Sequence, residues 1–150
     1  MTEMPAISGC ADSAITGSPS VANRPPRVLV TIASYGLSHI QFLRQIIRTY
    51  QCLPMDVRIV VLSDAPKDLD PNVEVIVGLP SSNPWTLPFA HKAVFAERAD
   101  LFDLFIYSED DIGASEANIR AFLDAAPQLA TDEIAGFLRY EVAADGTCFL

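Results

Sequence analysis

Two short runs of almost unbroken apolar residues constrain the fold of this chain most strongly. Arg27–Ser34 reads RVLVTIAS and residues 57–62 read VRIVVL, and both runs are rich in β-branched side chains. Strict alternation would indicate a strand with one solvated face, whereas continuous apolar runs are typical of strands that are covered on both faces. The sequence therefore predicts a buried parallel sheet with these two runs as central strands.

Segments with helical spacing separate the predicted strands. Ser38 stands three residues before Gln41, which is the spacing of a capping box, and predicts a helix over about residues 39–52. Val73–Val77 (VEVIV) is expected to be a third, shorter strand. A second helix is expected over residues 88–101.

The pattern continues in the second half of the chain. A further strand is expected from Leu104, and Ser115 is the predicted N-cap of the helix that follows it. Residues 134–142 (IAGFLRYEV) are predicted to form a fifth strand. Strands that alternate with helices build parallel βαβ units. We therefore expect an α/β fold with a Rossmann-like, mostly parallel sheet and helices on both faces.

The composition indicates one domain and argues against one class of partner. The chain has 150 residues, and 50% of them are hydrophobic, which is enough for a single core. Residues 1–26 mix small and polar residues without periodicity, so we expect a flexible arm followed by one domain over residues 27–150. The net charge of -9 argues against nucleic acid, because such a partner requires a clustered basic face.

The cysteines and the N-terminal sequence bear on location. Cys10, Cys52 and Cys148 are odd in number and widely spaced, so they indicate neither a disulfide framework nor a zinc site. The sequence shows no secretory signal and no apolar run of membrane-spanning length. These features predict a cytoplasmic protein without a transmembrane segment, and peripheral association with a membrane stays open.

An acidic triplet, Glu109-Asp110-Asp111, follows the apolar run that begins at Leu104. Adjacent carboxylates at the end of a buried strand make one another costly to ionise, so a cation is expected to offset them. On an extended chain Glu109 and Asp111 would share one face while Asp110 points away. Carboxylate oxygens suit Mg²⁺ or Mn²⁺, which take further ligands from water and substrate phosphates. We therefore predict a metal site at Glu109 and Asp111 that binds a metal diphosphate.

Other polar residues stand at the ends of predicted strands. Ser34 closes the first strand and Asp64 follows the second. In open parallel sheets, ligands bind beyond the carboxyl ends of the strands, so these side chains and the acidic triplet are expected to converge. Residues 78–88 contain Trp85, the only tryptophan, and are predicted to form a loop against the sheet with access to substrate.

The nucleotide-binding βαβ pattern followed by the acidic triplet resembles the GT-A glycosyltransferases and their D-x-D signature. Glu109-Asp110-Asp111 is similar to the E-D-D form found in the N-acetylglucosaminyltransferases that start hybrid and complex N-glycans, where an aliphatic residue and a helix also follow. A helix that contains a histidine precedes the motif there, as residues 91–101 with His91 do here. The resemblance covers about residues 27–142 and is most specific at the triplet.

The resemblance implies transfer of a sugar from a nucleoside-diphosphate sugar, with UDP-sugar as the expected donor and Mn²⁺ or Mg²⁺ as the metal. By this resemblance, Asp111 would coordinate the metal that bridges the diphosphate. Glu109 or Asp110 would hold the ribose or a metal-bound water. Asp64 and His91 would lie near the nucleobase.

The resemblance also places the turn that contains Ser34, Tyr35 and Gly36 near the nucleotide. The sequence ends where the acceptor-binding half of such an enzyme would begin, so we expect a domain that is incomplete at its C-terminus and a protein partner as one alternative. The acceptor is expected to be a glycan, a lipid or another hydroxyl compound. No catalytic base is identified.

Simpler interpretations of the same residues stay open. The triplet would then be a solvated turn, Asp64 would bond local backbone amides, and His91 with Lys92 would be an exposed pair at a helix start. For function, the alternative is a module that binds nucleotide sugar without turnover, or an inactive fragment that needs a partner. A metal-dependent phosphotransfer domain is a third alternative, although no glycine-rich phosphate loop is present.

Overall fold

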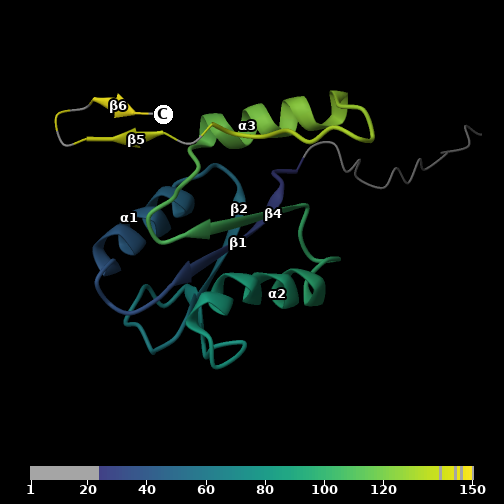
Figure 1. Ribbon diagram of the computed structural model, residues 1–150. Coiled ribbons are helices and arrows are strands. Elements are labelled where there is room, and N and C mark those ends of the chain that lie inside the picture. Colours follow the sequence, from purple (N-terminus) through teal and green to yellow (C-terminus); the bar gives the residue numbers. More distant parts are fainter. Residues whose placement is uncertain (1–23, 139, 144, 146, 150) are drawn as a thin grey trace, which may run out of the picture.

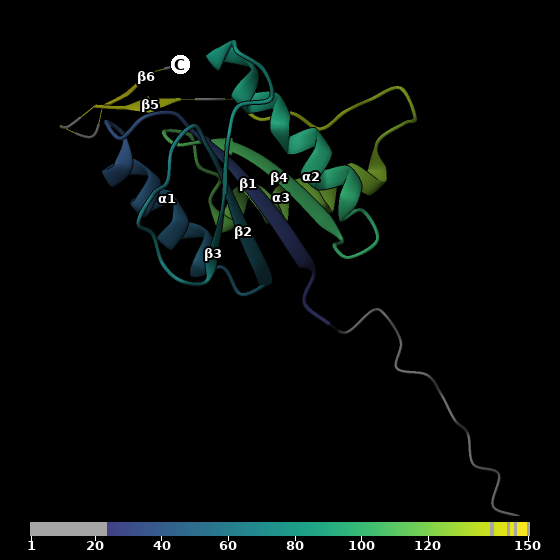
Figure 2. The ribbon, with the colours of Figure 1, turned by 90° about the horizontal axis from the view of Figure 1, so that it is seen from below.

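A parallel sheet forms the centre of the molecule (Figure 1). The computed structural model describes residues 24–138, 140–143, 145 and 147–149. The sheet has four strands in the order β3-β2-β1-β4, and each pair of neighbours is parallel. These strands are β1 (Arg27–Ser34), β2 (Asp56–Ser63), β3 (Val73–Val77) and β4 (Leu104–Glu109). The predicted α/β, Rossmann-like sheet is confirmed, and Figure 2 shows its strands side by side.

Helical segments cover both faces of the sheet. They are α1 (Ile40–Gln51), η2 (Pro84–Ala90), α2 (His91–Glu97), α3 (Glu116–Ala125) and η3 (Ala126–Gln128). Residues of α1 and α3 share one core cluster with the sheet, whereas residues of η2 and α2 share the other. Figure 1 accordingly shows α3 on one side of the sheet and α2 on the other.

β1 is the central element because its side chains enter both core clusters. Val28, Val30 and Ile32 pack toward α1, and Leu29 packs toward η2 and α2. All four side chains have no exposed surface. Complete burial of one such side chain contributes roughly 1.5–3 kcal/mol, so β1 anchors the whole sheet. The continuous apolar run that predicted this strand reflects burial on both faces.

The helix starts differ from expectation in two places. Ser115 caps α3 in a capping box with Asn118, as its sequence position predicts. The box expected from Ser38 and Gln41 is wrong, because His39 is the N-cap of α1 and makes no side-chain cap bond. The helix expected over residues 88–101 is shorter, since the prolines before it hold η2 in a 3-10 conformation.

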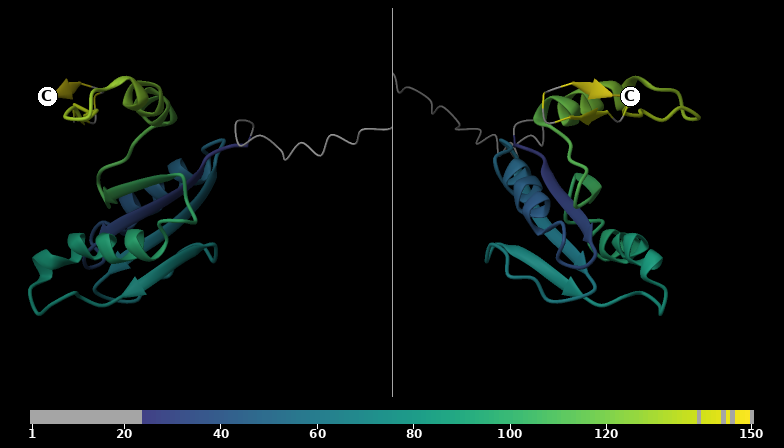
Figure 3. Two further views of the ribbon diagram at one scale, coloured as in Figure 1. Left: turned by 90° about the vertical axis from the view of Figure 1, so that its right-hand side faces the viewer. Right: turned by 60° about the vertical axis from the view of Figure 1, so that its left-hand side comes forward.

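The predicted fifth strand over residues 134–142 is wrong. Among the described residues of this segment, only Glu141–Val142 (β5) is a strand, and it pairs antiparallel with Cys148–Phe149 (β6) outside the main sheet. Ile134 is 92% exposed, and Phe137 packs on Phe122 of α3 with ring centroids 6.0 Å apart. Phe137 therefore contacts a helix and Ile134 stays exposed, so neither residue extends the sheet. Figure 3 shows α3 and the hairpin together on one side of the sheet.

Two arginines near the start of the described residues are tied to the loop before β4. The side chains of Arg24 and Arg27 both donate hydrogen bonds to the carboxylate of Asp103, which lies just before β4. The expected flexible arm, residues 1–26, otherwise falls on residues 1–23, outside the described residues. Within the described ranges, no helix is long and apolar enough to cross a membrane.

Candidate functional site

The strand order creates a crevice between β1 and β4. The chain leaves β1 through α1 to reach β2 on one side, and it reaches β4 on the other side through α2. Ligands of open α/β sheets bind at such a switch point, beyond the carboxyl ends of the strands. Register pairs Ser34 with Ser63 and Ala33 with Glu109. The strand ends predicted to converge therefore do lie at one edge of the sheet.

The acidic triplet begins a turn instead of continuing the strand. The amide of Ile112 donates a hydrogen bond to the carbonyl oxygen of Glu109 at 3.1 Å, which bends the chain after β4. Glu109 and Asp111 are exposed, and Asp110 is only 8% exposed. The expectation that Glu109 and Asp111 share one face requires an extended chain. The turn ends the extended geometry at Glu109, so that requirement is not met. We call residues 109–112 the acidic turn.

Asp110 is the buried anchor of the acidic turn. Its Oδ2 atom accepts a hydrogen bond from the Ser34 hydroxyl at 2.6 Å, and its Oδ1 atom lies 3.3 Å from Nδ1 of His39. Ser34 is 2% exposed, whereas the side chain of His39 is half exposed. A buried carboxylate is tolerated when donors satisfy it, so these partners fix the turn against β1 and the start of α1. Sequence reasoning missed His39, whose only signal is its place just after a strand end.

Tyr107 supports the neighbouring carboxylate from within β4. Its hydroxyl donates a hydrogen bond to Oε1 of Glu109 at 3.2 Å. Burial, followed by the negative charge of Glu109, raises the pKa of Tyr107 well above its usual range. The phenol therefore stays protonated and remains a donor. Sequence reasoning assigned Tyr107 no role, because it reads as one more apolar strand residue.

His91 lies beside Tyr107 and not in the crevice itself. Its Nδ1 atom is 2.5 Å from the carbonyl oxygen of Pro88, and its ring lies 4.5 Å from the Tyr107 ring, centroid to centroid. The ring of Phe95 packs on it at 5.3 Å. Lys92 contacts Phe89 through a cation–π interaction at 5.1 Å. The two residues at the start of α2 thus make local contacts.

Asp64 shapes the turn after β1. Its Oδ1 atom accepts a hydrogen bond from the amide of Gly36 at 2.8 Å, and the buried ammonium group of Lys67 donates to the carbonyl oxygen of the same glycine. Gly36 has a φ of +66°, a conformation that strains other residues. Asp64 and Lys67 together hold this turn and leave the side chain of Tyr35 exposed. Asp64 thus accepts from a backbone amide, as in the simpler interpretation, but this amide is 28 positions away in the sequence and not local.

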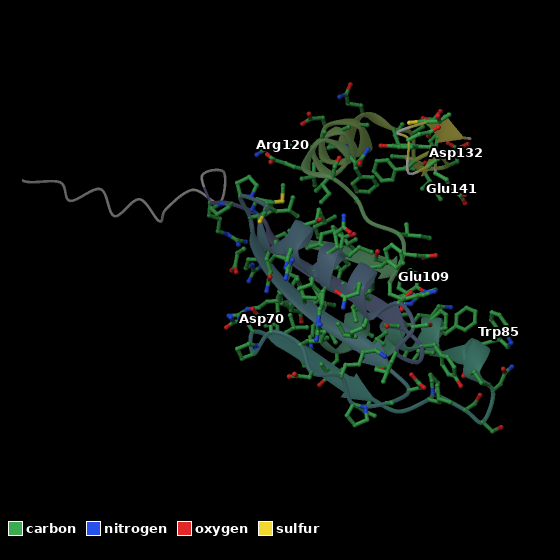
Figure 4. All side chains as sticks on the ribbon, turned by 90° about the vertical axis from the view of Figure 1, so that its left-hand side faces the viewer. Asp70, Trp85, Glu109, Arg120, Asp132 and Glu141 are labelled. Atoms are coloured by element: carbon green, nitrogen blue, oxygen red, sulfur yellow. The ribbon has the colours of Figure 1, made fainter. Side chains whose placement is uncertain are left out.

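A cavity of about 350 Å³ opens beside the acidic turn on the α2 face of the sheet. Its lining is mostly apolar and aromatic: Ala33, Tyr35, Pro84, Trp85, Leu87, Pro88, Glu109 and Asp110. Trp85 is 83% exposed although it lines the cavity, so it stands at the rim. Figure 4 shows Trp85 and Glu109 at the same end of the molecule, opposite Asp70.

A dication at the acidic turn would have to bring part of its own coordination shell. In the described part of the chain, no three His, Cys, Asp or Glu side chains are grouped to hold a metal. Asp110 already accepts bonds from its neighbours, while Glu109 and Asp111 have no arginine or lysine partner among these residues. Mg²⁺ and Mn²⁺ commonly take one or two protein carboxylates and complete their shell with water and phosphate.

Comparisons with protein-family profiles, with curated proteins and with solved structures find no significant match to this chain.

Proposed function

We propose that this chain binds a nucleoside-diphosphate sugar together with Mn²⁺ or Mg²⁺ and transfers the sugar to a hydroxyl acceptor. One observation carries the proposal: a cavity at the β1–β4 switch point is lined by the carboxylates of Glu109 and Asp110, with Asp111 next in the acidic turn, and no described basic side chain lines it. A diphosphate cannot approach such carboxylates without a cation between them. A metal bound to the diphosphate meets that requirement.

In this proposal Asp111 and Glu109 hold the metal, and Asp110 holds the turn that carries them. The metal would supply the positive charge that stabilises the departing diphosphate. Ser34 and His39 act as positioning residues, because they contact Asp110 and not the exposed carboxylates. Second-layer partners of this kind orient metal ligands and raise metal affinity.

The roles proposed for Tyr35, Asp64 and His91 depend on whether each residue lines the cavity. Tyr35 lines it and is placed to contact the donor, whereas Asp64 and His91 reach the donor only through the turn and the ring that they support. The acceptor is proposed to be a glycan, a lipid or another hydroxyl compound. The proposed cytoplasmic location depends on the cysteine pattern, and Cys52 carries an exposed free thiol.

Binding and turnover are tested separately. Calorimetric titration with UDP should give saturable binding when Mn²⁺ is present and little binding when EDTA replaces it. Asp111→Asn should abolish the metal-dependent part, and Asp100→Asn should leave it intact, because Asp100 is equally exposed but lies before β4. If Asp111→Asn binds Mn²⁺ and UDP as the unchanged chain does, the proposed metal site is wrong.

Release of UDP from UDP-sugars, with and without acceptors, then measures turnover. Release that depends on Mn²⁺ and disappears in Asp111→Asn supports a transferase. Tight binding of UDP with Mn²⁺ but no release supports the alternative, a nucleotide-sugar-binding module that does not turn over.

A further inference from the structure

The lining of the cavity has an unusual chemical balance. Its only charged side chains are the carboxylates of Glu109 and Asp110, and the rest of its surface comes from aromatic, aliphatic and proline residues. Among the described residues, the lining therefore offers carboxylate acceptors and only two side-chain donors, the Tyr35 hydroxyl and the Trp85 indole N–H. A phosphate group inside the cavity would face negative charge, so the diphosphate belongs outside it.

Trp85 is held in place although its ring is not packed. Its amide donates a hydrogen bond to Oδ1 of Asn83 at 3.1 Å, and the hydroxyl of Thr86 donates to the carbonyl oxygen of Asn83 at 2.6 Å. Ser81 adds a hydroxyl contact to Thr86 at 3.0 Å. These bonds fix the backbone of a residue whose side chain is almost fully exposed. Because the backbone of Trp85 is already fixed, only its side chain loses freedom when a ligand covers it, which favours binding.

The backbone beside Tyr35, the other aromatic residue of the lining, is also fixed. Tyr35 precedes Gly36, whose amide and carbonyl group are bound by Asp64 and Lys67. Tyr35 and Trp85 both line the cavity while exposing much of their rings. We call the part of the cavity that Tyr35, Trp85 and Glu109 line the aromatic slot.

We propose that the aromatic slot binds a neutral pyranose ring directly, without metal and without phosphate. The C–H face of a pyranose packs on aromatic rings, and its hydroxyl groups donate to carboxylates. Uracil fits less well, because a Tyr35 or Trp85 ring that stacks on the base cannot also donate its in-plane O–H or N–H to the two carbonyl groups of that base. The inference deepens the proposed function: the sugar end of the donor enters the slot while the diphosphate stays over Asp111.

The same ring chemistry has two possible sources, the sugar of the donor and a sugar of a glycan acceptor. The unique tryptophan reports on both, because Trp85 lies at the rim and the chain has no second tryptophan. Intrinsic fluorescence is therefore titrated with the methyl glycosides of glucose, galactose, mannose, xylose and N-acetylglucosamine, all in EDTA. Uridine and UDP in EDTA are the comparison ligands.

At least one methyl glycoside should change the Trp85 emission in a saturable way, and uridine and UDP should not. Tyr35→Ala should weaken that binding by about tenfold, the loss expected for one aromatic contact. Phe89→Ala is the matched control, since Phe89 is an exposed aromatic residue next to the slot but does not line it. Saturation-transfer NMR with Trp85→Ala gives a second readout, in which the glycoside signal should disappear.

Competition then identifies the source of the ring. If UDP-sugar with Mn²⁺ displaces the glycoside, the slot takes the donor sugar, and if both bind together, it takes an acceptor sugar. Failure of every glycoside in EDTA overturns the inference, even where UDP with Mn²⁺ binds and the proposed function stands. Binding of glycosides without any binding of UDP and Mn²⁺ would support sugar binding in the aromatic slot and contradict the proposed transferase function.

Discussion

The two ends of β4 carry acidic residues that are treated in opposite ways. At the amino end, the carboxylate of Asp103 receives hydrogen bonds from Arg24 and from the backbone and side chain of Arg27. At the carboxyl end, Glu109 and Asp111 have no arginine or lysine partner within the described ranges. The carboxylate at the start of β4 is thus paired with arginines, whereas the described residues provide no arginine or lysine partner for the carboxylates at its end.

The difference separates a structural role from a functional one. The pKa of Asp103 is held well below its usual range, first by the side-chain hydrogen bond from Arg27 and then by the backbone bond from the same residue. Such a carboxylate ties the N-terminal entry of β1 to the entry of β4. The acidic turn receives no comparable stabilisation from arginine or lysine among the described residues. Its role is therefore expected to be the binding of a cation from solution.

The largest effect is expected from Ser34→Ala at the carboxyl end. Loss of its hydroxyl removes a donor from the buried carboxylate of Asp110, which should lower the free energy of unfolding by roughly 1–3 kcal/mol. Affinity for Mn²⁺ with UDP should fall by about 10–100-fold, as for other second-layer partners. Denaturant unfolding and calorimetry measure the two changes.

Ser63→Ala is the control for that experiment. Ser63 is also buried, pairs in register with Ser34 and donates to the carbonyl oxygen of Ala65, but it does not contact Asp110. Its substitution should leave metal affinity unchanged. An equal loss of affinity in both variants would show that Ser34 acts through the sheet and not through Asp110.

The next effect concerns Asp103, where the expected loss is in stability alone. Asp103→Asn should lower the melting temperature without changing Mn²⁺ binding, because the arginine contacts lie at the other end of the strand. Glu109→Gln should do the reverse and leave the melting temperature unchanged or slightly higher, since it relieves repulsion within the triplet. Thermal unfolding measures both changes. A clear decrease in the melting temperature of both variants would contradict the proposed difference between the two ends of β4.

Acid unfolding sharpens this contrast. The folded-state pKa of Asp103 lies below its unfolded value, so its contribution to stability is complete above about pH 4 and is lost as pH falls toward the folded pKa. Urea midpoints at about pH 6 and about pH 3 should therefore differ less in Asp103→Asn than in the unchanged chain. An unchanged difference would show that the arginines do not stabilise the ionised carboxylate.

A smaller effect is expected where α1 contacts the loop after the acidic turn. The buried hydroxyl of Tyr50 accepts a hydrogen bond from the amide of Ala114 at 3.2 Å. Tyr50→Phe should lower the free energy of unfolding by about 1 kcal/mol, with little change in affinity for Mn²⁺ and UDP. A large loss of affinity without a loss of stability would mean that this loop, and not Asp110, sets the position of the carboxylates.

The smallest effect is expected inside β1. The hydroxyl of Thr31 is fully buried and has no hydrogen-bond partner among the residues described by the structure. Thr31→Val should leave stability unchanged or raise it by about 1 kcal/mol, because an unsatisfied polar group is removed from the core. A clear loss of stability in denaturant unfolding would mean that the hydroxyl has a partner.

The strands could be predicted because burial on both faces leaves a direct mark on the sequence. The continuous apolar run of β1 and the helical spacing of α1 each report packing against a neighbour. The order of the strands places a crevice between β1 and β4. This crevice lies at the strand ends where the sequence has polar residues. The prediction of a strand over residues 134–142 was wrong because Ile134 and Phe137 are apolar but do not pack in the sheet.

The details of the site could not be predicted, because they depend on contacts that are distant in the sequence. Asp110 is buried only because the chain turns after Glu109 and meets Ser34, which precedes it by 76 positions. His39 enters the site for the same reason. Trp85 was noted as the only tryptophan, but its place at the rim depends on the bonds of Asn83.

Calorimetric titration of Mn²⁺ and UDP into the unchanged chain, Asp111→Asn and Asp103→Asn tests the contrast between the two ends of β4 most directly. We expect binding to the unchanged chain and to Asp103→Asn, and no metal-dependent binding to Asp111→Asn. Equal binding to all three, or no binding to any, would contradict the assignment of the acidic turn as a metal-diphosphate site.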